Sequence, residues 1–198
     1  MTDMQEALFS LLDTALANRA DLITQLATEQ TNTYRLFHGS IEGVPGLTID
    51  KYNDLILIQT FHRALSNEQY EEIAGFYSRT YPDCALVYND RSHGNSRVMN
   101  HLSEEEKIIA YEPRIAQELG VNYRIQGRHN GQDPWLFLDL RAGRRRVMAE
   151  AEGKSVLNLF AYTCGVGVAA AKAGARHVVN IDFAESSLAV GKENAKLN

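Results

Sequence analysis

Apolar residues recur at steps of three and four near the start of the chain, which is the period of an amphipathic helix. The positions are Leu8, Leu11, Leu12, Ala15, Leu22 and Leu26. This pattern predicts a helical segment over residues 2–27, and the polar stretch TEQTNTY ends it. We therefore expect residues 1–33 to form a separate N-terminal helical segment.

Short apolar runs separated by turn residues follow, which is the pattern of β-strands. Strands are predicted at residues 34–37, 47–52, 55–61 and 84–90. Asn53 and Asp54 separate the second run from the third, as in a β-hairpin. The stretch GSIEGVPG predicts a loop, because it is rich in glycine and contains proline. Ser66 is the predicted N-cap of a helix that ends before Pro82.

A second hairpin is predicted over residues 112–127. Val121, Tyr123 and Ile125 alternate with polar residues, and Leu119 with Gly120 supplies the turn. The stretch LDLRAGRRRVMAEAEG then predicts a helix that stops at Gly153.

The last part of the chain reads as a βαβ unit. A buried strand at residues 156–159 leads into a glycine-bearing loop and an alanine-rich helix, and a second strand ends at Asp182. A final helix is predicted over AESSLAVGKENAKL. Such alternation is typical of a parallel α/β sheet. We predict an α/β fold in which an α+β domain (residues 34–132) precedes a partial Rossmann-like domain (residues 133–198), with the boundary near Asn130 to Pro134.

The predicted C-terminal sheet has only two strands. Two parallel strands do not bury their faces or their edges, and a doubly wound fold requires about five strands or more. The sequence therefore predicts that the chain is a fragment of a longer protein. Completion of the sheet by a partner subunit is the alternative.

Composition restricts the function. The net charge of −5 argues against a free-standing nucleic-acid-binding domain, although residues 124–146 carry six arginines against two aspartates, a net charge of +4 that indicates an anionic partner. No long apolar run and no signal peptide are present, so a cytoplasmic location without membrane contact is expected. Neither the two cysteines nor the six histidines show metal-ligand spacing, so no metal site is expected. Oligomeric state is left open.

The loop after residue 159 is the predicted ligand site. Gly165 and Gly167 permit close approach of the backbone, and the carboxylate of Asp182 is placed to accept ribose hydroxyls. A dinucleotide requires its glycines directly at the strand end, whereas five residues, Phe160 to Cys164, intervene here. Asn158, Tyr162 and Thr163 supply polar groups for an amino-acid end. The spacing therefore favours S-adenosylmethionine over NAD.

Three blocks of this sequence resemble the bacterial large-subunit (23S) ribosomal RNA methyltransferases of the cytosine-C5 and guanine-N7 types. The first is YRLFHGSIEGVPGLTIDKYNDLILIQ, the second is LFLDLRAGRRRVM, and the third runs from VLNLFAYTCGVG to KENAKLN. They occur in the family's order between Tyr34 and Asn198. Cys164 stands where the family usually has glycine, and Leu140 replaces a frequent glutamine.

This resemblance implies a class I methyltransferase fold that binds S-adenosylmethionine. It implies that Asp182 holds the ribose and that Phe183 packs on the adenine. The methionine end would lie near Asn158, Phe160, Tyr162, Thr163 and Gly165. It further implies that Asp139 and Arg141 lie beside cofactor and substrate.

The arginines on the predicted helix before residue 153 are candidate RNA contacts. Arg144, Arg145 and Arg146 would meet phosphate groups. The family's D-P-P motif and catalytic cysteine are expected downstream of Asn198, so no catalytic residue is assigned and the fragment itself is expected to be inactive. The predicted function is methylation of a base in ribosomal RNA. The alternatives are a nicotinamide-dependent oxidoreductase and a non-catalytic RNA-binding module.

Overall fold

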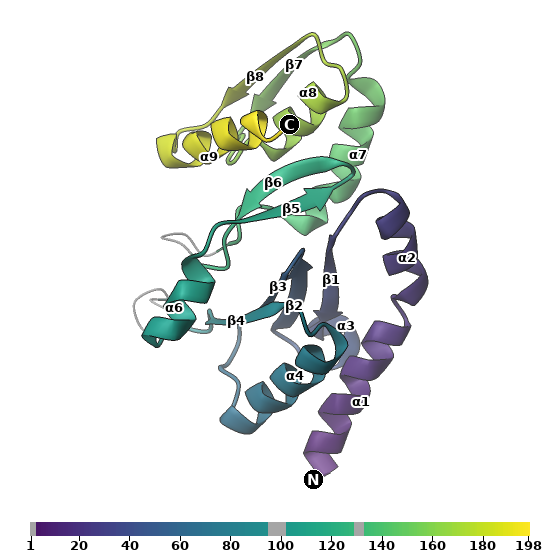
Figure 1. The fold of residues 1–198 in the computed structure, drawn as a ribbon, viewed down its shortest axis with the longest axis vertical. Helices are drawn as coiled ribbons and strands as arrows, with labels where there is room; N and C mark the ends of the chain where they lie inside the picture. The colour runs from purple at the N-terminus through teal and green to yellow at the C-terminus, as the bar shows by residue number, and fades with distance from the viewer. Residues whose placement is uncertain (1–2, 95–101, 129–132) are drawn as a thin grey trace.

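The computed structural model describes residues 3–94, 102–128 and 133–198, with side chains from Leu8 onward. The N-terminal half and the C-terminal half lie at opposite ends of the long axis, and a hairpin lies between them (Figure 1). No helix in these ranges is long and apolar enough to cross a bilayer.

The N-terminal segment forms two helices rather than the single predicted helix. α1 (Asp3–Ala17) and α2 (Ala20–Thr28) are separated by Asn18 and Arg19. The guanidinium of Arg19 donates to the Ala15 carbonyl at 2.8 Å and forms an ion pair with Glu42 at 2.5 Å. The spacing of apolar residues does not predict this break between the two helices, where Arg19 makes its long-range contact with Glu42.

Residues 33–90 form a four-stranded sheet in the order β1-β2-β3-β4. β1 (Thr33–His38), β2 (Leu47–Tyr52) and β3 (Leu55–Thr60) are antiparallel, whereas β4 (Ala85–Asp90) is parallel to β3. The predicted hairpin is confirmed, with Asn53 in the left-handed conformation at φ 56°. The loop prediction for GSIEGVPG is wrong in part, because Gly39–Glu42 form the single helical turn α3.

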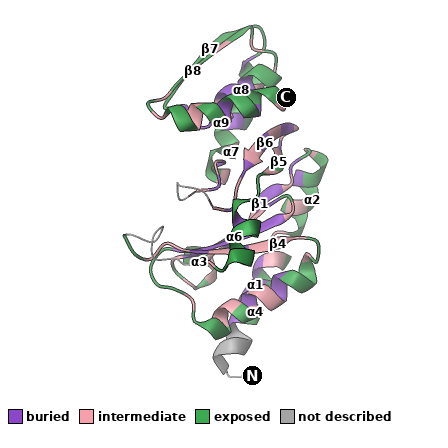
Figure 2. Ribbon diagram, turned by 60° about the vertical axis from the view of Figure 1, so that its left-hand side comes forward, coloured by how far each residue is buried: buried purple, intermediate pink, exposed green. Residues whose placement is uncertain are grey.

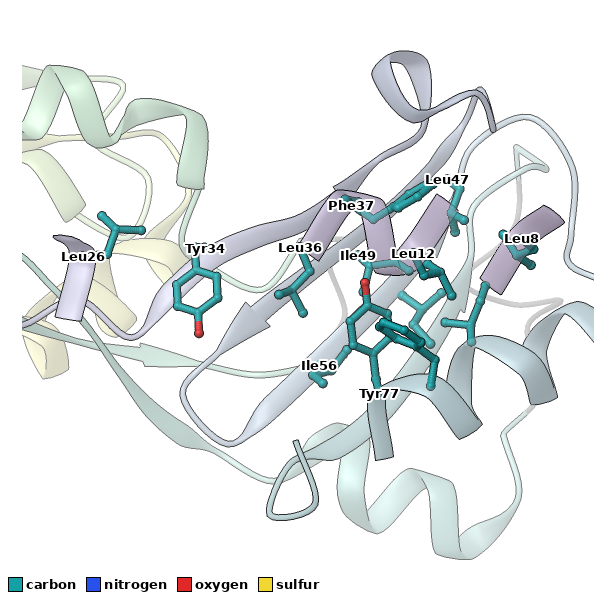
Figure 3. Close-up of a cluster of buried hydrophobic side chains, with 14 residues drawn as sticks. Leu8, Leu12, Leu26, Tyr34, Leu36, Phe37, Leu47, Ile49, Ile56 and Tyr77 are labelled. Atoms are coloured by element: carbon teal, nitrogen blue, oxygen red, sulfur yellow. The ribbon is translucent and has the colours of Figure 1, made fainter. Parts of the chain in front are cut away.

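The two faces of this sheet pack against different partners because successive side chains of a strand point to opposite faces. Ile56 and Ile58 lie in a core with Leu12 of α1 and Tyr77 of α4 (Figure 3). α4 (Asn67–Thr80) begins at a capping box in which Ser66 accepts from the Gln69 N–H, which confirms the predicted N-cap.

The other face of the sheet contacts the second hairpin. β5 (Arg114–Glu118) and β6 (Val121–Ile125) form this predicted hairpin. Leu55 and Leu57 share a buried cluster with Tyr123 of β6 and Ala169 of the C-terminal half. Helix α6 (Glu104–Tyr111) was not predicted, although Ser103 and Glu106 form a capping box there.

The C-terminal half contains the predicted βαβ unit. A short 3₁₀ turn, η1 (Leu138–Leu140), leads into α7 (Arg141–Glu150). β7 (Ser155–Leu159) and β8 (His177–Ile181) are parallel, and α8 (Gly165–Lys172) connects them. α9 (Glu185–Lys196) ends the fold. Within the described ranges this sheet has two strands, which agrees with the prediction.

One face of the β7–β8 sheet is open. Its apolar side chains are 39–62 % exposed and belong to Leu157, Leu159, Val179 and Ile181. Figure 2 shows both strands largely in the colour of exposed residues, with the buried part of α8 beside them. The boundary predicted near Asn130 to Pro134 falls largely outside the described residues, so the domain division stays a prediction.

Candidate functional site

The carboxylate of Asp182 faces the loop between β7 and α8. Its Oδ1 accepts the backbone N–H of Ala184 at 2.9 Å, and its Oδ2 accepts that of Tyr162 at 2.8 Å. These two hydrogen bonds hold the pKa of Asp182 below its ordinary value. Each carboxylate oxygen has a second lone pair, so the side chain retains capacity to accept further hydrogen bonds.

The loop itself adopts an unusual backbone. Phe160, Tyr162 and Cys164 all lie in the left-handed region, with φ angles of 52°, 49° and 60°. Residues with a side chain seldom adopt this conformation, and its occurrence clusters at functional sites. The Ala161 N–H donates to the Ile181 carbonyl at 3.0 Å, which ties the loop to the end of β8.

Side chains from distant segments fix the loop in place. The Tyr162 hydroxyl donates to Asp133 at 2.7 Å, and the Thr163 hydroxyl donates to the Trp135 carbonyl at 2.6 Å. Burial, followed by the hydrogen bond to Asp133, raises the pKa of Tyr162 well above its ordinary value. Asn194 of α9 donates to the Thr163 carbonyl at 3.0 Å. Sequence reasoning missed the roles of Asp133, Trp135 and Asn194 because these contacts are long-range.

Gly167 allows α8 to pack closely against β8. A Cβ atom there would lie 2.0 Å from Oδ1 of Asn180, which itself accepts from the Asn158 side chain at 2.9 Å. The side chain of Asn158 is therefore held between the two strands. At Gly165 the nearest side-chain atom would lie 3.9 Å from a Cβ, on Tyr123.

A recess of about 130 Å³ lies beside the loop. The predicted residues that line it are Asn158, Phe160, Tyr162, Thr163 and Gly165. Phe160, which also lines the recess, is 86 % exposed, and Phe183, next to Asp182 in the chain, is 91 % exposed. Pockets for drug-sized ligands measure roughly 300–1,000 Å³. The recess is smaller than such pockets.

Asp139 and Arg141 do not line this recess. The Arg141 guanidinium donates to Glu118 at 2.8 Å and to the Thr33 carbonyl. Asp139 is exposed. Arg141 is therefore engaged in contacts that hold the hairpin and β1 to α7.

The prediction that Arg144 contacts RNA is wrong. Its side chain is 2 % exposed and forms a 2.5 Å ion pair with Glu118, whose side chain is fully buried. Arg145 pairs with Glu29 at 2.7 Å, and Arg146 pairs with Glu150 on its own helix. The side chain of Arg145 is 48 % exposed and that of Arg146 is 80 % exposed.

Neither cysteine has the environment of a nucleophile. Cys164 is buried, and burial followed by the charge of Asp182 raises the pKa of its thiol. Burial also raises the pKa of Cys84. A raised pKa lowers the thiolate fraction at neutral pH, and the thiolate is the reactive form.

Sequence comparison shows what the chain is similar to. Residues 34–198 match the family described as S-adenosylmethionine-dependent methyltransferase. A relative from Aeromonas salmonicida, named ribosomal RNA large subunit methyltransferase I, is 36% identical over 169 residues, which are 83% of this chain and 42% of that protein. A ribosomal RNA large subunit methyltransferase from Deinococcus radiodurans is 31% identical over 94% of this chain and 46% of its own length. The chain thus spans about half the length of the curated relatives it matches.

Solved structures give the same result. A candidate S-adenosylmethionine-dependent methyltransferase from Streptococcus mutans is 28% identical, with a TM-score of 0.79 over 98% of this chain and 49% of that one. A candidate methyltransferase in complex with SAH is 28% identical with a TM-score of 0.80, over 98% of this chain and 48% of its own. The predicted class I fold is confirmed. The chain belongs to the family of S-adenosylmethionine-dependent methyltransferases.

Proposed function

We propose that the chain supplies the first half of an S-adenosylmethionine site in an enzyme that methylates a base of ribosomal RNA. The observation that carries this proposal is the Asp182 carboxylate at the end of β8, hydrogen-bonded to the loop at Tyr162 N–H. In nucleotide-binding α/β folds an acidic residue at this place binds the ribose hydroxyls, and the ligand lies beyond the carboxyl ends of the strands.

The surroundings of Asp182 suit a nucleoside without phosphate. Phe183, directly after it, is 91 % exposed and offers an apolar ring to an adenine. The bulky residues Phe160 and Tyr162 occupy the turn where a pyrophosphate would need close backbone approach. The amide of Asn158 and the loop hydroxyls line the recess on the other side. The methionine portion of the cofactor would lie there.

The bound cofactor would supply the methyl group, and this chain's residues would orient it. The left-handed loop, held by Asp133, Trp135 and Asn194, keeps its donors and acceptors in fixed positions, which reduces the ordering cost of binding. The open apolar face of β7 and β8 and the small recess support weak binding by this chain alone. The substrate is proposed from the names of the relatives, which are ribosomal RNA methyltransferases.

Cofactor choice is tested by amide chemical-shift titration, because this method detects weak binding. S-adenosylhomocysteine at millimolar concentration is expected to shift the amides of Tyr162, Phe183 and Ala184, and NAD is expected to leave them unchanged. Asp182→Asn should abolish the response, whereas Asp21→Asn on α2 should preserve it. A response to NAD alone would instead favour an oxidoreductase.

The reaction is tested by transfer of a tritiated methyl group to ribosomal RNA. The assay uses a protein that contains this chain and is as long as the relatives. We expect tritium label to appear in the RNA. Asp182→Asn should reduce this label at least about tenfold, since loss of one good charged hydrogen bond removes about 1.5–3 kcal/mol. Cofactor binding without transfer would point to a non-catalytic RNA-binding protein.

A further inference from the structure

An aromatic and basic surface lies at the carboxyl ends of β3 and β4. The two strands are parallel, so the residues that follow them are neighbours, and the Arg91 N–H donates to the Thr60 carbonyl at 2.8 Å. The guanidinium of Arg91 lies 4.9 Å from the centre of the Phe61 ring. Phe61 is 39 % exposed, so the pair forms a solvent-facing stack.

Further exposed side chains that carry or can gain positive charge follow the two strands in the chain. Arg63 is exposed after β3, as are His62 beside it and His93 after β4. The nearby Asp90 carboxylate is engaged within its own turn, where it accepts from the Ser92 N–H at 2.9 Å and the Thr60 hydroxyl at 3.2 Å. We call this surface the Phe61–Arg91 patch, and its members are Phe61, His62, Arg63, Arg91 and His93.

Phe61 lies on the side of the sheet that contacts the second hairpin. By alternation along β3, Phe61 continues the face of Leu55 and Leu57, which pack against the hairpin and α8. Burial lowers the pKa of Arg91, and the negative charge of Asp133 opposes this shift. Asp133 in turn accepts the hydroxyl of Tyr162 from the candidate cofactor loop.

We propose that the Phe61–Arg91 patch binds single-stranded RNA, with a base stacked on Phe61 and phosphates held by Arg63 and Arg91. Single-stranded RNA is bound by aromatic side chains that stack on bases and by cations that follow the backbone. An aromatic ring already paired with a guanidinium presents both functions at one place. This inference rests on the proposed function, since it proposes where this chain binds the RNA substrate.

A chemically similar pair on another surface provides a matched control. The Arg79 guanidinium lies 5.9 Å from the Phe9 ring, and Phe9 is 42 % exposed. This pair lines a groove with Glu68, Glu71 and Glu72, whose charges repel phosphate. The pair belongs to α1 and α4, which cover the opposite face of the sheet.

The test measures binding of a fluorescein-labelled, mixed-sequence RNA of about twelve nucleotides, close to the site size of single-strand binders, by anisotropy without cofactor. Phe61→Ala is expected to weaken binding by about fivefold or more, as for loss of one stacked base. Arg63→Gln is expected to reduce the slope of log Kd against log salt by about 0.7. Phe9→Ala and Arg79→Gln should behave as the unmodified chain, and circular dichroism should show all four variants folded.

Each result decides the inference. Weaker binding by the Phe61 and Arg63 variants alone supports it. Equal effects of the Phe9 and Arg79 variants, or no RNA binding by the chain, overturn it. Equally tight binding of a duplex RNA of the same length would also overturn the assignment to single-stranded RNA. The proposed function is tested separately, because the chemical-shift titration uses S-adenosylhomocysteine and no RNA.

Discussion

The buried carboxylate of Glu118 connects the hairpin to helix α7, and its neutralisation should destabilise the fold. Its side chain has no exposed surface, and it pairs with Arg144 and Arg141 at 2.5 Å and 2.8 Å. Glu118→Gln preserves the shape but removes the negative charge, so the guanidinium of Arg144, 2 % exposed, stays buried without a counter-charge.

The expected loss follows from this burial. Breaking a buried ion pair by removing one partner costs about 3–5 kcal/mol. Glutamine still accepts a hydrogen bond, so the lower end applies, about 3 kcal/mol. For a chain of this size this corresponds to a decrease in Tm of about 6–12 °C. Thermal unfolding followed by circular dichroism measures it.

Arg145, the neighbour of Arg144 on α7, provides a matched control. Glu29→Gln removes the partner of Arg145 in an exposed ion pair, and exposed pairs contribute little to stability, so its Tm should stay near that of the unmodified chain. Adding Arg144→Met to Glu118→Gln should recover part of the loss, because the unpaired buried charge is removed. A Tm for Glu118→Gln equal to that of Glu29→Gln would refute the reasoning.

Three further outcomes are expected. Gly191→Ala would place a Cβ atom 2.3 Å from the sulfur of Cys164, so urea unfolding should show a loss of about 1–3 kcal/mol. Adding Cys164→Gly, which also relieves the φ of 60°, should restore stability, and additive losses would contradict this. Backbone hydrogen bonds lower the pKa of Asp182 in the folded chain. Its charged form therefore stabilises the fold at pH values above the ordinary pKa of 3.8, and this stabilisation is lost as the pH falls through the lower pKa of the folded chain. The difference in Tm between the unmodified chain and Asp182→Asn should shrink on acidification, and a constant difference would argue against the two backbone hydrogen bonds. Leu159→Gln should reduce concentration-dependent light scattering, because Leu159 is 55 % exposed on the open sheet face, whereas Leu26→Gln, at a buried position, should instead lower Tm.

Local patterns in the sequence were sufficient for most elements of the fold. Asn53-Asp54 and Leu119-Gly120 identified both hairpins, because turn residues with left-handed backbone are few. Ser66 identified the start of α4, because its side chain caps the helix within three residues. The glycine-bearing loop and Asp182 predicted a parallel βαβ unit, because strand, turn and helix follow one another directly in the chain.

Contacts between distant residues decided the rest. Arg144 was predicted to be an exposed cation because it lies in the sequence RRR. Its side chain is instead buried in an ion pair with Glu118, which is distant in the chain. Gly167 was predicted to allow close approach of a ligand, yet the side chain of Asn180 by itself leaves no room for a Cβ atom at this position. The pairing of Phe61 with Arg91 depends on the parallel register of β3 with β4. The sequence alone determines which backbone conformations and burial patterns are favourable nearby, whereas the tertiary structure determines which charges and rings meet, because that depends on packing between elements remote in the chain.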